Sequence, residues 1–240
     1  RRRMRLYASG AGATLGLVLM IGLAWGSHHP ALQVGAVAVE GNQILAAGSL
    51  AAVAESVIAD ESFVPFSRSN MLIFSRAAIE DRLVEEFPRI LSVDASLGSF
   101  AEHRVDVSIV ERVPYVRYCD TAACYLVDET GLIFAREGDE TGGGAVVRDE
   151  IFEGGMPYGI NGIGGIVLPG LFASVLETVR HLEREGVNVI RITVLNDQDF
   201  SMTLQDGARI IVRFRDDPAL IFENFKSTLR AESLSKGTSA

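Results

Sequence analysis

The stretch IVERVPYVRYC, residues 109–119, decides how this chain divides, because one alternating strand stops within it and another begins. Pro114 cannot donate a backbone hydrogen bond and holds its predecessor in extended geometry, so it does not belong inside a continuous strand. We therefore predict a domain junction at Glu111, Arg112 and Pro114, with one unit ending before it and another beginning at Tyr115. A kink within one continuous sheet is the alternative.

The residues before the junction predict a small α+β unit. Strands are expected within 34–42, 91–97 and 105–109, because apolar and polar residues alternate there. Two helices are expected between the first two strands. One begins at Ser49 as N-cap, and the other runs from Ser75 to Phe87. Two helices on one face of a three-stranded sheet would bury their apolar stripes.

The residues after the junction predict a β-rich domain with flanking helices. Strands are expected at 115–119 and 124–128, in the LIFA segment and at 187–195, and a hairpin is expected around Asp206-Gly207. Helices are expected at 171–185 and after Asp217. The glycine-rich residues 138–170 are expected to form a long connection, and the tail 232–240 to be disordered.

The N-terminal segment carries a membrane signal. Residues 6–26 contain no charged residue, and at about 1.5 Å per residue they span roughly 31 Å, close to the thickness of a bilayer core. Four arginines within residues 1–5 would keep this stub in the cytoplasm. We predict a single-pass type II membrane protein with an extracytoplasmic body. A cleaved secretory signal ending at Ala24-Trp25-Gly26 is the alternative.

Composition limits the chemistry that we expect. Hydrophobic residues make up 48% of the 240, enough for packed cores, and the formal net charge of −9 argues against nucleic acid as a partner. The four histidines lack metal-ligand spacing, and no nucleophile motif or phosphate-binding glycine pattern is present. We therefore expect no catalytic residues, no metal, no cofactor and no small-molecule substrate.

The two cysteines, Cys119 and Cys124, flank a four-residue hairpin loop. Outside the cytoplasm a pair so close in sequence is expected to form a disulfide that clips the hairpin. A metal site is the alternative, but two thiols alone make a poor one.

The order of these elements, together with four short motifs, resembles the bacterial cell-division protein family FtsQ, called DivIB in Gram-positive bacteria. The motifs are VEGN (39–42), FPRI (87–90), ERVP (111–114) and VDETGLIF (127–134). The similarity covers roughly residues 34–230. It implies a POTRA domain of β-α-α-β-β order at 34–112 and the family's β domain at 113–231, after a cytoplasmic stub at 1–5 and a transmembrane helix at 6–26.

The resemblance implies a non-enzymatic assembly factor of the divisome at the septum of the inner (plasma) membrane. Such a protein links early and late division proteins by binding FtsB- and FtsL-like (DivIC-like) partners. Two alternatives from other classes stay open. One is another POTRA-type chaperone or secretion module of outer-membrane assembly, and the other is a membrane-anchored hydrolase.

The resemblance also points to a partner-binding surface. Family members usually add a Tyr-x-Asp-Leu-Arg strand after the last helix, whereas this chain ends in AESLSKGTSA. It also does not begin with methionine, so we expect truncation at both ends. Without that strand the 208–214 strand would offer an open edge. The helical period directs Ile221, Phe225 and Leu229 to the core, which leaves three predicted partner contacts. These are Arg213, Phe222 and Lys226, and Phe222→Ala is predicted to weaken binding without loss of stability.

Overall fold

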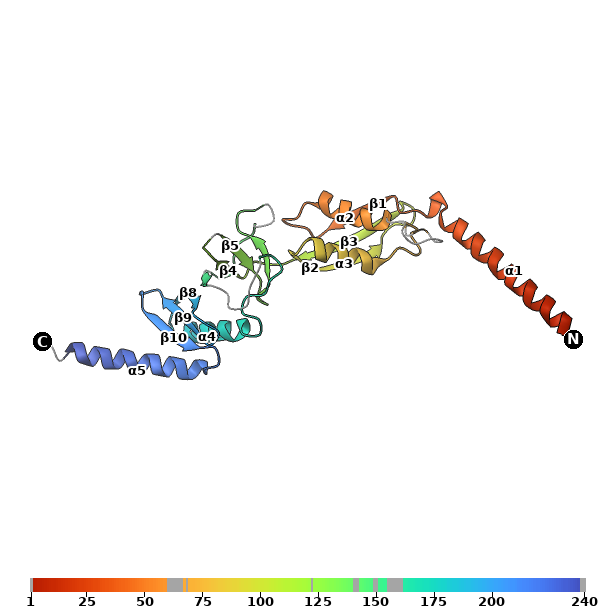
Figure 1. Cartoon of the computed structure of the whole chain (residues 1–240). Coiled ribbons are helices and arrows are strands. Elements are labelled where there is room, and N and C mark those ends of the chain that lie inside the picture. Colours follow the sequence, from red (N-terminus) through yellow and green to blue (C-terminus); the bar gives the residue numbers. More distant parts are fainter. Residues whose placement is uncertain are drawn as a thin grey trace. The chain divides into compact units, whose positions relative to one another are not determined.

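The computed structural model describes residues 2–59, 67, 69–121, 123–139, 143–148, 151–154 and 162–237, with side chains from 14 to 228. The chain forms two compact units, Arg1–Glu111 and Arg112–Ala240 (Figure 1). The boundary therefore falls inside the ERVP motif. β3 (Arg104–Glu111) and β4 (Val116–Cys119) belong to separate sheets, so the alternative of a kink within one sheet is wrong.

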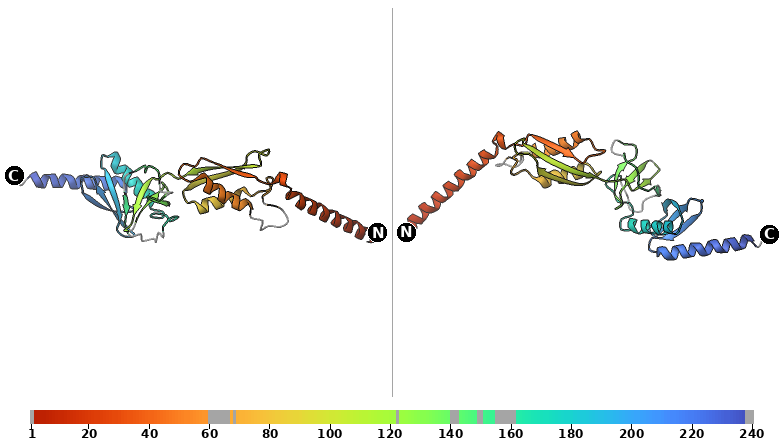
Figure 2. Two further views of the ribbon diagram at one scale, coloured as in Figure 1. Left: turned by 90° about the horizontal axis from the view of Figure 1, so that it is seen from above. Right: turned by 180° about the vertical axis from the view of Figure 1, so that it is seen from behind.

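Unit 1 contains a three-stranded sheet in the order β1-β3-β2, in which β1 runs parallel and β2 antiparallel to β3. Helices α2 and α3 lie on one face of this sheet (Figure 2). α2 begins at Ala47, so Ser49 lies inside the helix rather than at its cap, whereas Ser75 caps α3 by accepting from the Ala78 amide at 3.2 Å. The elements are α1 (Arg2–Ser27), a 3-10 turn (Pro30–Leu32), β1 (Ala36–Glu40), α2 (Ala47–Ala59), α3 (Arg76–Glu86), β2 (Ile90–Leu97) and β3.

The core of unit 1 follows the predicted apolar stripes. Leu50 from α2 and Ile79 and Leu83 from α3 are fully buried against Val105 and Val107 of β3. Burial of each such side chain contributes on the order of 2 kcal/mol. The other face of the sheet is largely exposed and carries the apolar Val110 together with small or charged residues, among them Ala36, Ala38, Glu40, Ser92, Asp94 and Ser108.

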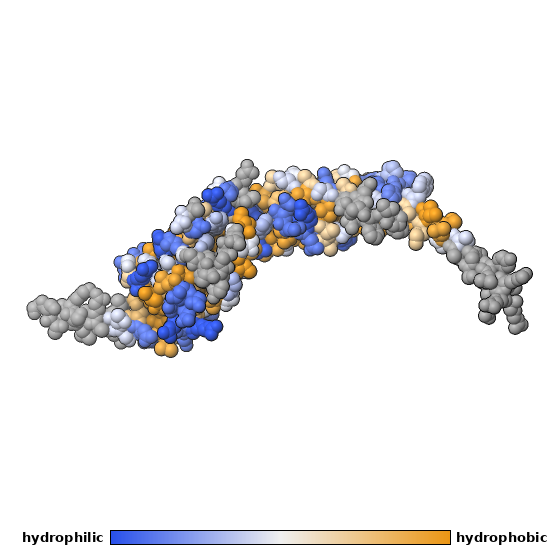
Figure 3. All heavy atoms as spheres, viewed as in Figure 1, coloured by the Kyte–Doolittle hydropathy of each residue, from blue (hydrophilic) through white to orange (hydrophobic). Residues whose placement is uncertain are grey.

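Helix α1 corrects the predicted fold class. Among the helices whose side chains are described, none combines the length and the apolar character that crossing a bilayer requires. This finding overturns the predicted transmembrane helix at 6–26. The side chains of α1 that the structure describes, at residues 14–27, are mostly apolar and exposed (Figure 3). The fold is α+β, with five α-helices and two sheets in the described residues.

Unit 2 is built on one seven-stranded sheet in the order β10-β9-β8-β7-β4-β5-β6. Its hairpins are β4 with β5 and β9 with β10, and the second turns at Asp206-Gly207 as expected, with Gly207 at φ +87°. The further elements are β5 (Cys124–Val127), β6 (Ile133–Arg136), β7 (Ile151–Glu153), α4 (Phe172–Arg184), β8 (Val189–Val194), β9 (Asp199–Leu204), β10 (Arg209–Arg213) and α5 (Pro218–Gly237).

Strand β7 lies within residues 138–170, which the sequence led us to expect as a connection. Its three residues pair in parallel with both β4 and β8, so β7 joins the two halves of the sheet. Phe152 at its centre is fully buried and packs against Phe172 of α4 with ring centroids 5.3 Å apart. Three residues are too few to show an alternating pattern, and long-range pairing rather than local sequence selects this strand.

Helices α4 and α5 complete the core of unit 2. The buried side of α4 includes Val175, Val179 and Leu182, which pack against the sheet. Ile221 anchors α5 to the same core. α5 continues to Gly237, into the segment 232–240 for which we expected disorder, and the last three residues lie outside the described part of the chain.

Candidate functional site

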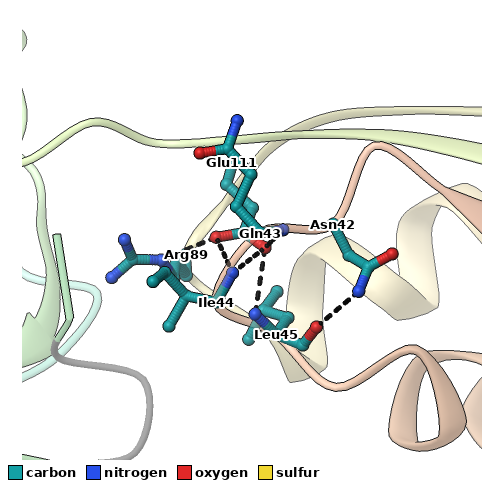
Figure 4. A network of polar contacts seen from close by, with 6 residues as sticks. All are labelled: Asn42, Gln43, Ile44, Leu45, Arg89 and Glu111. Atoms are coloured by element: carbon teal, nitrogen blue, oxygen red, sulfur yellow. Dashed lines mark hydrogen bonds and ion pairs between the residues drawn. The ribbon is translucent and has the colours of Figure 1, made fainter.

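Glu111, the last residue of β3, accepts hydrogen bonds from three consecutive backbone amides (Figure 4). The amides of Gln43, Ile44 and Leu45 donate to its Oε1 at 2.7, 3.0 and 3.0 Å. The Nε of Arg89 donates to Oε2 at 2.9 Å, and the Arg89 and Glu111 side chains are only 4% and 5% exposed. Successive amides that converge in this way form a natural anion site, which an internal carboxylate fills here.

This network sets the ionisation of Glu111. Burial by itself raises the pKa of a carboxyl group, but the amides of Leu45 and Gln43, the Arg89 guanidinium and the Ile44 amide favour the charged form. The net result is that the pKa of Glu111 lies below its ordinary value. Glu111 is therefore a charged, fully bonded group in the interior of unit 1.

Gly41 of the VEGN motif makes this turn possible. Its φ is +86°, a conformation that residues with a side chain rarely adopt, and an added Cβ would lie 2.2 Å from the Ile109 carbonyl oxygen. The next residue, Asn42, donates from Nδ2 to the Leu45 carbonyl at 2.9 Å and closes the loop that presents the three amides. The glycine and the asparagine therefore shape the binding loop for Glu111.

Arg112, the first residue of unit 2, forms an ion pair within its own unit. Its guanidinium donates to Asp128 Oδ2 at 2.5 Å, and both side chains are largely buried. The other carboxylate oxygen of Asp128 accepts from the Thr130 amide and hydroxyl and from the Leu132 amide, at 2.9, 2.6 and 3.0 Å. The aspartate of the VDETGLIF motif thus orders the β5–β6 turn and binds Arg112 at the same time.

Pro114 is buried. In sequence it lies between β3 and β4, and it belongs to neither strand. Its carbonyl accepts from the Val147 amide at 2.9 Å, and the Tyr115 carbonyl accepts from the Arg148 amide at 2.9 Å. The three junction residues that the sequence singled out therefore have distinct contacts. Glu111 binds within unit 1, whereas Arg112 and Pro114 bind within unit 2.

Cys119 and Cys124 are directly opposed on β4 and β5 and are joined by a disulfide, with their Cα atoms 4.1 Å apart. The turn between them also carries hydrogen bonds from Asp120, whose amide donates to the Ala123 carbonyl and whose carboxylate accepts from the Ala123 amide, at 2.9 and 2.8 Å. The disulfide therefore closes a hairpin that the backbone already shapes.

Strand β10 is an edge of the seven-stranded sheet. The Leu204 amide donates to Ala208 and the Phe214 amide donates to Gln198, so the even-numbered residues of this strand bond to β9. In an antiparallel ladder the alternate residues, Arg209, Ile211 and Arg213, then direct their backbone groups away from β9. The Arg213 amide and carbonyl bond to the Asp216 side chain and amide at 3.3 and 3.2 Å.

The opposite edge of this sheet is partly covered. The Ile133 amide of β6 donates to the Gly165 carbonyl and its carbonyl accepts from the Gly164 amide, both at 2.8 Å. β10 is consequently the more open of the two edges, and its outward backbone groups centre on Ile211, whose side chain is 63% exposed.

The predicted partner contacts do not form one surface. Arg213, whose side chain is 74% exposed, alternates with the core residue Val212 and so lies on the outer face of β10. Phe222 is half-buried on α5, on the core side, where its ring lies 6.4 Å from that of His181 and 5.7 Å from the Lys226 ammonium. The structure therefore brings Phe222 and Lys226 together and separates Arg213 from them. The side chain of Leu229 lies outside the described residues.

A groove of about 440 Å³ adjoins the end of β10. It is lined by Leu171, Asp197, Gln198, Arg213, Phe214 and Arg215. Across the described residues no group of three metal-ligating side chains is present. The groove extends the β10 edge with a surface that combines apolar residues with residues of both charges.

Sequence reasoning identified Glu111, Arg112 and Pro114 as junction residues but missed what they bind. Their partners Arg89 and Asp128 lie inside the FPRI and VDETGLIF motifs. The presence of these motifs in the sequence could therefore have pointed to the two ion pairs. No family model matches this sequence, and no curated protein matches it either.

Proposed function

We propose that this chain is a non-enzymatic assembly factor of the bacterial division machinery, which binds FtsB- and FtsL-like (DivIC-like) partners. The observation that supports this most is the convergence of the motifs. Those containing Gly41, Arg89 and Glu111 build one buried network in unit 1, and the fourth supplies the aspartate that binds Arg112. Short motifs that are individually unspecific gain weight when each contributes a part of the same structure.

The β10 edge provides the binding mode. An exposed strand edge binds an extended peptide through backbone hydrogen bonds, and the side chains beside it select the sequence. On the outer face of β10, Arg209 and Arg213 flank Ile211. Directly opposed side chains on neighbouring strands stabilise pairing when their charges are opposite or both are apolar. The matching partner strand therefore alternates acidic, apolar and acidic residues on that face.

The disulfide between Cys119 and Cys124 supports a place of action outside the cytoplasm, because disulfides persist in oxidising compartments. In this proposal the body lies outside the cytoplasm, and its place at the division septum follows from the proposed partners.

A second candidate is a POTRA-type chaperone or secretion module of outer-membrane assembly. The β-α-α-β-β order of unit 1, with both helices on one sheet face, favours it equally. The two candidates differ in their partners, so partner identity separates them.

The test is a pull-down with the tagged chain from detergent-solubilised bacterial envelopes, followed by mass spectrometry. Recovery of septal coiled-coil division proteins supports the first candidate, and recovery of outer-membrane barrels supports the second. Ile211→Pro removes one outward amide from β10 and should abolish capture, whereas Ile211→Thr keeps the amide and a β-branched side chain and should retain it. Equal capture by both variants would show that the partner binds elsewhere.

A further inference from the structure

Strand β2 is a second sheet edge, besides β10, to which an added strand could pair. It lies at the edge of the unit 1 sheet and is eight residues long. The Gly98 amide donates to the Arg104 carbonyl at 3.1 Å, which places Ser96 and Asp94 in bonded pairs with β3. The alternate residues Val93, Ala95 and Leu97 therefore direct their backbone groups toward the free edge.

One of these outward groups is already occupied. The Ala95 amide, at the middle of the three, donates to Glu80 Oε1 of α3 at 2.9 Å. Glu80 follows the core residue Ile79 by one position, about 100° around the helix, so it stands at the flank of α3 that faces the edge of β2. The carboxylate thus reaches around the sheet edge from a helix that is fixed in the core.

We propose that Glu80 closes the β2 edge to strand addition. An incoming strand must place a carbonyl oxygen on the Ala95 amide, where the carboxylate now lies, and the negative charge repels that oxygen. The neighbouring Asp94 is exposed and adds a second charge at the same strand. Charged side chains at a strand edge are a recognised protection against unwanted pairing.

The β2 and β10 edges differ in which outward backbone amide is bound by a side chain. On β10 the Asp216 side chain binds the amide of Arg213 at the end of the strand, and in the described residues no side chain binds the amide of Ile211 at its centre. On β2 the occupied group is the central one. Glu80 therefore determines specificity by excluding β2 from competition with β10. This last step rests on the proposed function, whereas closure of β2 itself does not.

The experiment compares wild type, Glu80→Ala, Glu80→Gln and Asp81→Ala in the full chain. Hydrogen exchange of the Ala95 amide, read by NMR or by peptide-resolved mass spectrometry, should accelerate about tenfold or more in Glu80→Ala. Sedimentation velocity should show new concentration-dependent association of that variant through β2 of a second copy. Glu80→Gln retains an acceptor without the charge and should fall between Glu80→Ala and wild type.

Asp81→Ala is the matched control, because it removes an exposed carboxylate one position further along α3. It should match wild type in both measurements. Unchanged exchange and unchanged association in Glu80→Ala would overturn the proposal. If that variant does not fold, as judged by circular dichroism, wild-type exchange rates for Ala95 in Glu80→Gln would overturn it. Neither measurement involves β10, so a failure here is distinct from a failure of the proposed partner binding.

Discussion

Arg89 and Glu111, 22 positions apart, form a 2.9 Å ion pair whose side chains are almost completely buried in unit 1. A buried pair of this kind is tolerated only when further hydrogen bonds satisfy both groups. The amides of residues 43–45 satisfy the carboxylate, so this pair joins the end of β3 to the loop after β1 and to the start of β2. The pair thereby connects all three strands of the sheet.

Removing Glu111 should strongly destabilise unit 1. Glu111→Ala removes the carboxylate that the buried Arg89 and three backbone amides bind, and we expect a loss of about 3–5 kcal/mol in the free energy of unfolding. Urea unfolding followed by fluorescence and circular dichroism measures this loss. The double variant Arg89→Met/Glu111→Leu should lose less than the two single changes added together. Strict additivity would contradict a coupled pair.

The same network should make stability depend on pH in the acidic range. The folded-state pKa of Glu111 is lowered, so its stabilisation is fully present above the unfolded pKa of about 4.3 and is lost as pH falls through the folded value. The difference in unfolding free energy between wild type and Glu111→Gln should be constant from about pH 5 to 7 and shrink at lower pH. A difference that grew below about pH 4 would contradict a lowered pKa.

Gly41 and Gly48 offer a matched pair of alanine substitutions. Gly41→Ala places a Cβ 2.2 Å from a backbone carbonyl oxygen at positive φ, and we expect it to destabilise unit 1 by more than about 2 kcal/mol. Gly48→Ala lies in α2 with no atom within 4 Å of the new methyl, and it should stabilise by roughly 0.5–1 kcal/mol. Thermal unfolding midpoints of the two variants should shift in opposite directions.

Removing the disulfide should affect unit 2 only modestly. The bond joins residues five positions apart, and in the chain-entropy model so small a loop contributes about 2 kcal/mol. The double change Cys119→Ala/Cys124→Ala should lower the stability of unit 2 by no more than this amount and leave that of unit 1 unchanged. Non-reducing mass spectrometry of wild type made in an oxidising compartment should find no alkylatable thiol. Two free thiols there would refute the bond.

Phe222 should act as a packing residue. Because its ring is half-buried against the core of unit 2 and touches His181, we expect Phe222→Ala to lower stability by about 2 kcal/mol, contrary to the neutral effect expected from the helical period. Leu220→Ala, at a side chain 59% exposed on the same helix, should stay within about 0.5 kcal/mol of wild type. If the two variants are equally stable, Phe222 is not a packing residue, and it is again a candidate partner contact.

The sequence alone determined the features that depend on neighbouring residues. Alternation predicted the long strands, helical spacing predicted α2, α3 and α4, and Asp206-Gly207 predicted the β9–β10 turn. Pro114 marked the point where one sheet ends and another begins, because a missing amide and a fixed φ are properties of the residue itself. The apolar run at 6–26 predicted a membrane span, and this prediction was wrong, because no helix in the described residues combines the length and the apolar character of a span.

Tertiary structure alone decided the features that depend on distant partners. β7 is a strand because β4 and β8 flank it, although its own three residues carry no period. Glu111 is buried and charged because a loop 66–68 positions earlier and Arg89 converge on it. Phe222 packs against the core beside the buried Ile221, although the helical period directed Ile221, Phe225 and Leu229 there and not Phe222. Hydrogen bonds and packing between residues far apart in sequence select these outcomes, and no short window contains both partners.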